Sequence, residues 1–210
     1  MNLRVPGPTP CPEDVLLAGA QPMINHRGEE FAALISRIHS NLQTVFRTTN
    51  DIAILTASGT AAMEAAIVNT LSPGDVILGV TVGVFGERFL QIASTYGVTV
   101  IKLEFPYGTV ADPQEIDNAL HVHNEVSAVL VTHNETSTGV TNDIESIASV
   151  VKDREKLLLV DAISSLGCIR LDTDKWNCDV VVTGSQKGFM VPPGLAFAAI
   201  SPEAWSANSK

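Results

Sequence analysis

The chain of 210 residues has little cysteine and little positive charge. Its three cysteines, Cys11, Cys168 and Cys178, are odd in number and show no C-x-x-C spacing, which indicates neither a disulfide framework nor a zinc site. Its 13 Lys and Arg residues form no cluster and are outnumbered by 23 Asp and Glu residues. The formal net charge of −10 argues against a nucleic acid or an anionic membrane as partner. We therefore expect small-molecule partners and no metal.

Long apolar runs are also missing. No run approaches the ~20 residues that cross a membrane, and the opening residues MNLRVPGP lack the apolar segment of a secretory signal. Together with unpaired cysteines, this predicts a cytoplasmic protein. The content of 45% hydrophobic and 17% charged residues is nevertheless typical of a chain that buries a sizeable core.

What the chain does have is an alternation of strand-like and helix-like segments. Short apolar runs predict seven strands, and apolar residues at helical spacing predict helices between most of them. The expected strands cover residues 52–55, 76–80, 98–103, 128–131, 157–160, 180–182 and 195–200, and the expected helices cover 28–47, 61–71, 86–96, 113–120 and 144–152. This order predicts an α/β fold with a mostly parallel sheet and helices on both faces. No helix separates the last two strands, so we expect the final strand to run antiparallel.

Ligands of such sheets gather at the carboxyl ends of the strands, where three features carry chemistry. Ser58-Gly59-Thr60 opens a helix and offers free N–H groups, hydroxyls and a positive dipole end, which suit a phosphate. Ser58 also has the chemistry of a helix N-cap, and capping alone would explain the turn. The spacing of a Walker loop or a G-x-G-x-x-G dinucleotide motif is missing.

Asp161 and Lys187 each follow a buried apolar run. A carboxylate at the place of Asp161 is costly unless it is paired, although a simple turn cap would also place an aspartate there. Lys187, with Gly184 and Gly188 beside it, can lose solvation and its proton and become a nucleophile; alone, it would be taken as a surface lysine.

A dense polar run, residues 132–139, follows another strand and predicts the wall of a site. Its His133 is expected to be a partly buried, hydrogen-bonded histidine rather than a metal ligand, because no other ligands lie at suitable spacing.

A phosphate-binding turn, a carboxylate and an amine are together the groups that a site for pyridoxal 5′-phosphate requires. Lys187 would form a Schiff base with the cofactor aldehyde, and Asp161 would keep the pyridine nitrogen protonated. The helix N-terminus at Ser58 would hold the phosphate. The released lysine could then move a proton at the substrate carbon.

The sequence resembles the class V pyridoxal-phosphate aminotransferases, in the alanine–glyoxylate and serine–pyruvate group. The likeness spans nearly the whole chain and rests on seven motifs in the family's order: PGPT (6–9), NHR (25–27), SGT (58–60), FGER (85–88), THNETSTG (132–139), VDAISS (160–165) and TGSQK (183–187). It implies the large domain of a type I aminotransferase as the fold. It implies Lys187 and Asp161 as catalytic residues, and as cofactor-binding residues Ser58, Gly59, Thr60, Phe85, Thr136, Asp161, Ile163, Gln186 and Lys187.

The resemblance also sets expectations for the domains. Residues 1–27 would be an N-terminal arm and residues 28–210 the cofactor-binding large domain. In the family a smaller C-terminal domain follows, and it carries the arginine that grips the substrate carboxylate; here we expect it to be absent. Arg27, Arg88 and Arg170 match other family positions.

For function, the resemblance implies transfer of an amino group from alanine or serine to glyoxylate or pyruvate by a homodimer. Two alternatives stay open. One is another chemistry of the class, such as cysteine desulfuration or a lyase reaction, and the other is an inactive cofactor or dimerisation domain.

Overall fold

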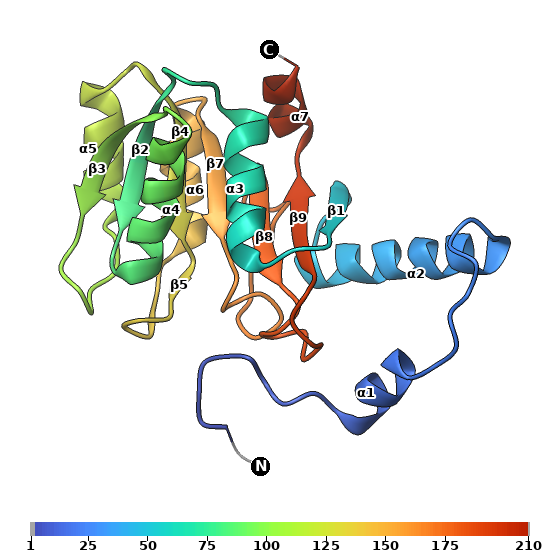
Figure 1. Ribbon diagram of the computed structural model, residues 1–210. Coiled ribbons are helices and arrows are strands. Elements are labelled where there is room, and N and C mark those ends of the chain that lie inside the picture. Colours follow the sequence, from blue (N-terminus) through green and yellow to red (C-terminus); the bar gives the residue numbers. More distant parts are fainter. Residues whose placement is uncertain (1–2, 210) are drawn as a thin grey trace.

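The computed structural model describes residues 3–209, and its centre is a seven-stranded sheet in the order β1-β9-β8-β7-β4-β2-β3 (Figure 1). The strands are β1 (Asp51–Leu55), β2 (Val76–Thr81), β3 (Thr99–Glu104), β4 (Val126–Thr132), β7 (Leu157–Asp161), β8 (Val180–Gly184) and β9 (Ala196–Ile200). β9 pairs antiparallel with both β1 and β8, and the remaining pairs are parallel. The predicted α/β class, the seven strands and the reversed final strand are confirmed.

Helices cover both faces of the sheet, as predicted. Figure 1 shows α3 (Gly59–Thr70) and α4 (Val84–Thr95) on one face, and α5 (Pro113–Val122) and α6 (Ile144–Asp153) on the other. Two buried clusters follow this division: Met63 and Phe89 belong to one, and Ile116 and Ile147 belong to the other. The central strands are therefore buried on both sides, which explains their continuous apolar runs.

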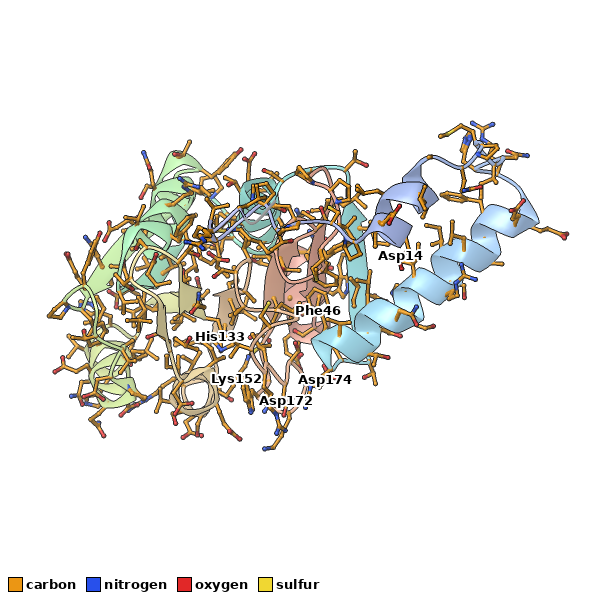
Figure 2. All side chains as sticks on the ribbon, turned by 90° about the horizontal axis from the view of Figure 1, so that it is seen from below. Asp14, Phe46, His133, Lys152, Asp172 and Asp174 are labelled. Atoms are coloured by element: carbon orange, nitrogen blue, oxygen red, sulfur yellow. The ribbon has the colours of Figure 1, made fainter. Side chains whose placement is uncertain are left out.

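The first two helices of the chain extend away from this body. α1 (Glu13–Gly19) has no buried residue, and α2 (Glu29–Phe46) buries only Leu42 and Phe46. Figure 2 shows α2 projecting from the sheet, with Phe46 at the end that meets it. The apolar stripe that predicted this helix is thus only partly buried, with Ile35 and Val45 exposed.

Four short elements were not predicted from the sequence. They are α1, the two-residue strands β5 (Asn134–Glu135) and β6 (Val140–Thr141), and α7 (Pro202–Asn208). β5 and β6 pair antiparallel just beyond β4 and bring the polar run 132–139 back on itself. Among the helices of residues 3–209, none is both long and apolar enough to cross a bilayer.

Candidate active site

A cavity of about 340 Å³ lies at the carboxyl ends of the parallel strands. The structure brings every site residue expected from the sequence into its wall: Ser58, Gly59, Thr60, Phe85, Thr136, Asp161, Ile163, Gln186 and Lys187. These residues come from segments that are far apart in the chain, and the parallel sheet gathers them at a single edge. Figure 1 shows the N-terminal arm passing below this edge.

One end of the cavity is the N-terminus of α3. Ser58 has an extended backbone and its Oγ accepts a hydrogen bond from the N–H of Ala61 at 3.4 Å, so the predicted N-cap is confirmed. The N–H groups of Gly59 and Thr60 donate to no atom within residues 3–209. These free donors, at the positive end of a helix of twelve residues, are available to an anion in the cavity.

Gly59 is required at this helix start by a close contact. A Cβ added to it would lie 2.7 Å from Cδ1 of Ile163 and 2.9 Å from its Cγ1. The side chain of Ile163, which follows β7, therefore packs directly on the first residue of α3. This contact fixes the helix N-terminus relative to the end of β7.

The carboxyl group of Asp161 ends β7 and is only 2% exposed. Its Oδ1 accepts a hydrogen bond from the N–H of Ile163 at 2.9 Å, which is the turn-capping role considered for it. Its Oδ2 accepts no hydrogen bond from residues 3–209, although Asp161 lines the cavity. Burial raises the pKa of Asp161 to about 7, although the hydrogen bond from the N–H of Ile163 lowers it. The nearby carboxylate of Glu135 also raises this pKa, whereas the positive charges of Lys187 and Arg88 lower it.

Lys187 lies in the tight link between β8 and β9. The link is closed by a hydrogen bond from Ser185 Oγ to the carbonyl of Pro192 at 2.7 Å, and by one from the N–H of Met190 to the carbonyl of Lys187 at 3.0 Å. The lysine side chain is half-buried at the cavity wall.

The N-terminal arm holds this link from the other side. The N–H of Thr9 donates to the carbonyl of Gln186 at 2.9 Å, and Thr9 Oγ1 donates to the carbonyl of Lys187 at 3.0 Å. A Cβ added to Gly7 would lie 2.6 Å from Cδ and 2.8 Å from Nζ of Lys187. The arm therefore lies directly against the lysine side chain, and a larger residue at position 7 would require that side chain to move.

Phe85 and Arg88 extend the wall from the first turn of α4. The guanidinium carbon of Arg88 lies 5.1 Å from the centroid of the Phe85 ring, which is a cation–π contact. Behind them, the buried carboxylate of Glu135 accepts hydrogen bonds from the N–H groups of Phe85 and Gly86 at 3.0 and 3.1 Å.

The model of the family described as aminotransferase class-V matches residues 7–208. The chain belongs to this family. This class V chain is 44% identical over 208 residues to the "Soluble hydrogenase, small subunit" of Synechococcus sp.. The match covers 98% of this chain and 54% of that protein. It is 38% identical to an L-aspartate–glyoxylate aminotransferase of Paracoccus denitrificans, covering 97% and 52%.

Solved structures give the same picture of the fold. An alanine–glyoxylate aminotransferase from Nostoc sp. superposes with a TM-score of 0.94 at 34% identity, over 98% of this chain and 55% of that one. The class V chain described here thus spans about half the length of the relatives it matches.

Several cavity residues of this class V chain were not assigned from the sequence. They are Gly7, Pro8, Met63, Arg88, Asn134, Ser164 and Pro193. Asn134 and Ser164 bind each other, since Asn134 Nδ2 donates to Ser164 Oγ at 2.9 Å and Ser164 Oγ donates to the carbonyl of Asn134 at 2.8 Å. Both lie in motifs that the sequence analysis identified, THNETSTG and VDAISS, so their place in these motifs could have indicated that they line the site. Of the three arginines considered, only Arg88 lines the cavity, while Arg170 pairs with Asp172.

The expectation for His133 was wrong in one respect. Figure 2, which looks onto the carboxyl ends of the strands, labels His133 at this edge, where it is 3% exposed. Its backbone is well bonded, with its N–H donating to the carbonyl of Asp161 at 2.8 Å. The ring atom Nδ1, however, is buried without a hydrogen-bond partner in residues 3–209. Burial lowers the pKa of His133 to about 4, so the ring is neutral at pH 7.

Proposed function

We propose that this class V chain binds pyridoxal 5′-phosphate in the cavity and uses it to transfer an amino group from a small amino acid to a small 2-oxo acid. The observation that carries the proposal is the meeting of three complementary groups in one cavity. They are the open N-terminus of α3, the unpaired Oδ2 of Asp161 and the amine of Lys187.

The cavity fits the two charged ends of the cofactor. The free N–H groups of Gly59 and Thr60 suit a phosphate, which is a dianion near neutral pH. Oδ2 of Asp161 lacks a donor and suits a protonated ring nitrogen. A cationic ring beside Asp161 favours the ionised carboxylate and so offsets the burial that raises its pKa.

The walls of the cavity fit a flat ring. Phe85 and Ile163 provide apolar surface from α4 and from the segment after β7, and we assign them to the two ring faces. Thr136 and Gln186 are polar wall residues, and we assign Thr136 to the phenolic oxygen and Gln186 to a position near the cofactor.

Lys187 has two tasks in the proposal. When bound, the cofactor supplies an aldehyde and an electron-accepting ring. Lys187 would hold that aldehyde through its amine and, once an amino acid has displaced it, would move a proton between the substrate α-carbon and the cofactor. The N-terminal arm lies against the side chain that performs both tasks, at Gly7.

We assign alanine or serine as amino donor and glyoxylate or pyruvate as acceptor. The support is the presence of serine–glyoxylate and alanine–glyoxylate aminotransferases among the relatives.

We further propose that two copies associate through α1 and α2. The support is the apolar surface that these helices expose, including Leu16 at 53%, Leu17 at 56% and Ile35 at 38%. Large exposed apolar side chains of this kind are typical of a protein–protein interface.

The test of the cofactor assignment is covalent trapping. Wild type, Lys187→Ala and the control Lys175→Ala would be mixed with pyridoxal 5′-phosphate and reduced with borohydride, and the modified lysine located by mass spectrometry. We expect modification at Lys187 in wild type and in the control, and loss of the specific adduct in Lys187→Ala. Lys175 is a suitable control because its amine pairs with Glu145 at 3.0 Å on the surface. Equal labelling of all three chains would refute the assignment.

A further inference from the structure

We propose that Glu135 is a positioning residue that holds Phe85 against the cofactor ring by capping α4 from outside the helix. The proposal rests on the proposed cofactor site and concerns a residue with no contact to the cofactor cavity itself. Glu135 is not among the cavity-lining residues, and it is fully buried.

The carboxylate of Glu135 is saturated with hydrogen bonds. Its Oε2 accepts from the N–H groups of Phe85 and Gly86 at 3.0 and 3.1 Å. Its Oε1 accepts from the N–H and the Oγ of Ser137 at 3.0 and 2.6 Å. The carboxylate therefore lies at the positive end of α4 and accepts hydrogen bonds from the N–H groups of its first turn.

The helix itself offers no cap of its own. The N-cap position of α4 is Gly83, which makes no side-chain hydrogen bond. A Cβ at Gly83 would lie 2.5 Å from Cγ of Glu135, 2.6 Å from its Cδ and 2.7 Å from Oγ of Ser137. The glycine therefore leaves the space that Glu135 and Ser137 fill, and Ser137 Oγ accepts the N–H of Val84 at 3.2 Å.

This arrangement makes the N-termini of α3 and α4, which lie at the same sheet edge, differ in whether their first N–H groups are free. At α4 the first N–H groups are taken by side chains from the β5–β6 hairpin, whereas at α3 those of Gly59 and Thr60 are free. An anionic ligand is thereby directed to α3, and the first turn of α4 is left to supply the apolar ring of Phe85. Since the N–H of Phe85 is itself bound by Glu135, loss of the carboxylate releases the residue that forms the wall.

The experiment compares Glu135→Ala, Glu135→Gln and Asp143→Ala with wild type. Asp143 caps α6 on the opposite face, where its Oδ1 accepts from the N–H of Ser146 at 3.1 Å, so its loss removes a helix cap without touching the cavity. Two quantities are measured: hydrogen exchange of residues 84–88 in the cofactor-free chain, and the affinity and visible circular dichroism of bound pyridoxal 5′-phosphate.

We expect Glu135→Ala to exchange about tenfold faster at residues 84–88 and to bind the cofactor about tenfold more weakly, with reduced visible dichroism, as loss of about 1.4 kcal/mol would produce. Glu135→Gln keeps one acceptor oxygen of the same reach, which can face the N–H groups of Phe85 and Gly86, and should restore part of both properties. Asp143→Ala should change neither.

Faster exchange with unchanged affinity and dichroism would show a purely structural cap and overturn the proposal. Unchanged hydrogen exchange in Glu135→Ala would also overturn the proposal. So would a Glu135→Gln variant whose exchange and cofactor affinity are no closer to wild type than those of Glu135→Ala. If wild type itself shows no Lys187-dependent binding, the proposed function fails as well, and the exchange data still show separately whether Glu135 caps α4.

Discussion

At the scale of single residues, burial shifts the pKa values of two neighbouring side chains in opposite directions. Asp161 and His133 are linked through their backbones at 2.8 Å and both are almost fully buried. The pKa of Asp161 rises to about 7 and that of His133 falls to about 4, because the buried environment disfavours each charged form. The cofactor-free edge of the sheet thus favours uncharged groups.

This predicts the pH dependence of stability in the cofactor-free chain. Unfolded Asp161 ionises near pH 4 and folded Asp161 near pH 7, so its stabilising contribution is present at low pH and is lost as the pH rises towards 7. Asp161→Asn should therefore gain stability relative to wild type between pH 4.5 and pH 8, by at most about 4 kcal/mol. Urea unfolding of both chains at the two pH values measures this.

His133 has the opposite slope, since its contribution is present above about pH 6.5 and is lost as the pH falls towards 4. Both chains carry His133, so the comparison cancels it. A stability difference that does not change with pH would contradict the raised pKa of Asp161.

At the scale of elements, the start of α3 shows packing outweighing helix propensity. Alanine is favoured over glycine inside helices by about 0.5–1 kcal/mol. At Gly59, however, the added Cβ would lie 2.7 Å from Ile163 Cδ1, and overpacking of this kind costs about 1–3 kcal/mol. We therefore expect the cost of the steric conflict to exceed the gain in helix propensity.

We expect Gly59→Ala to lower the free energy of unfolding and to weaken pyridoxal 5′-phosphate binding, because α3 must shift away from the end of β7. Thermal unfolding and a cofactor titration measure both. The double variant with Ile163→Ala removes the atoms that conflict and should show a smaller loss than the two single changes predict together. Simple additivity of the single effects would argue that this contact does not fix the helix.

The elements also show what the sequence could and could not predict. The strands were predictable from their continuous apolar runs, and most of the larger helices from apolar residues at helical spacing, such as Ile147 and Val151 on α6. α1 buries nothing, and α7 buries only Ala204, so neither carried that signal, although Ser201 and Pro202 are a normal helix start. The cavity residues could be predicted from motifs at strand ends. The cap formed by Glu135 could not, since it depends on a contact with α4 from a distant segment.

At the scale of the whole molecule, the projecting helices predict the oligomeric state. Ile35 lies on the apolar side of α2 and is 38% exposed, and Ile35→Glu would place a charge in the proposed interface. We expect this variant to be monomeric where wild type is dimeric, as measured by sedimentation velocity. Val122→Glu, at a 71% exposed position on α5, is the control and should stay dimeric. A wild-type chain that is already monomeric would refute the interface.

The reversed strand β9 has a consequence for the order of folding. Within residues 3–209, β1 pairs with β9 alone, and its register joins Asp51 to Ile200 and Leu55 to Ala196. Pairing of segments so distant in the chain closes a very long loop and is slow. On the ribosome, β1 emerges early but stays without its neighbour until the last strand has been made. α3, which follows β1 and packs on β8 and β9, must wait with it, so the end of the cavity formed by α3 is completed only after β9 has been made.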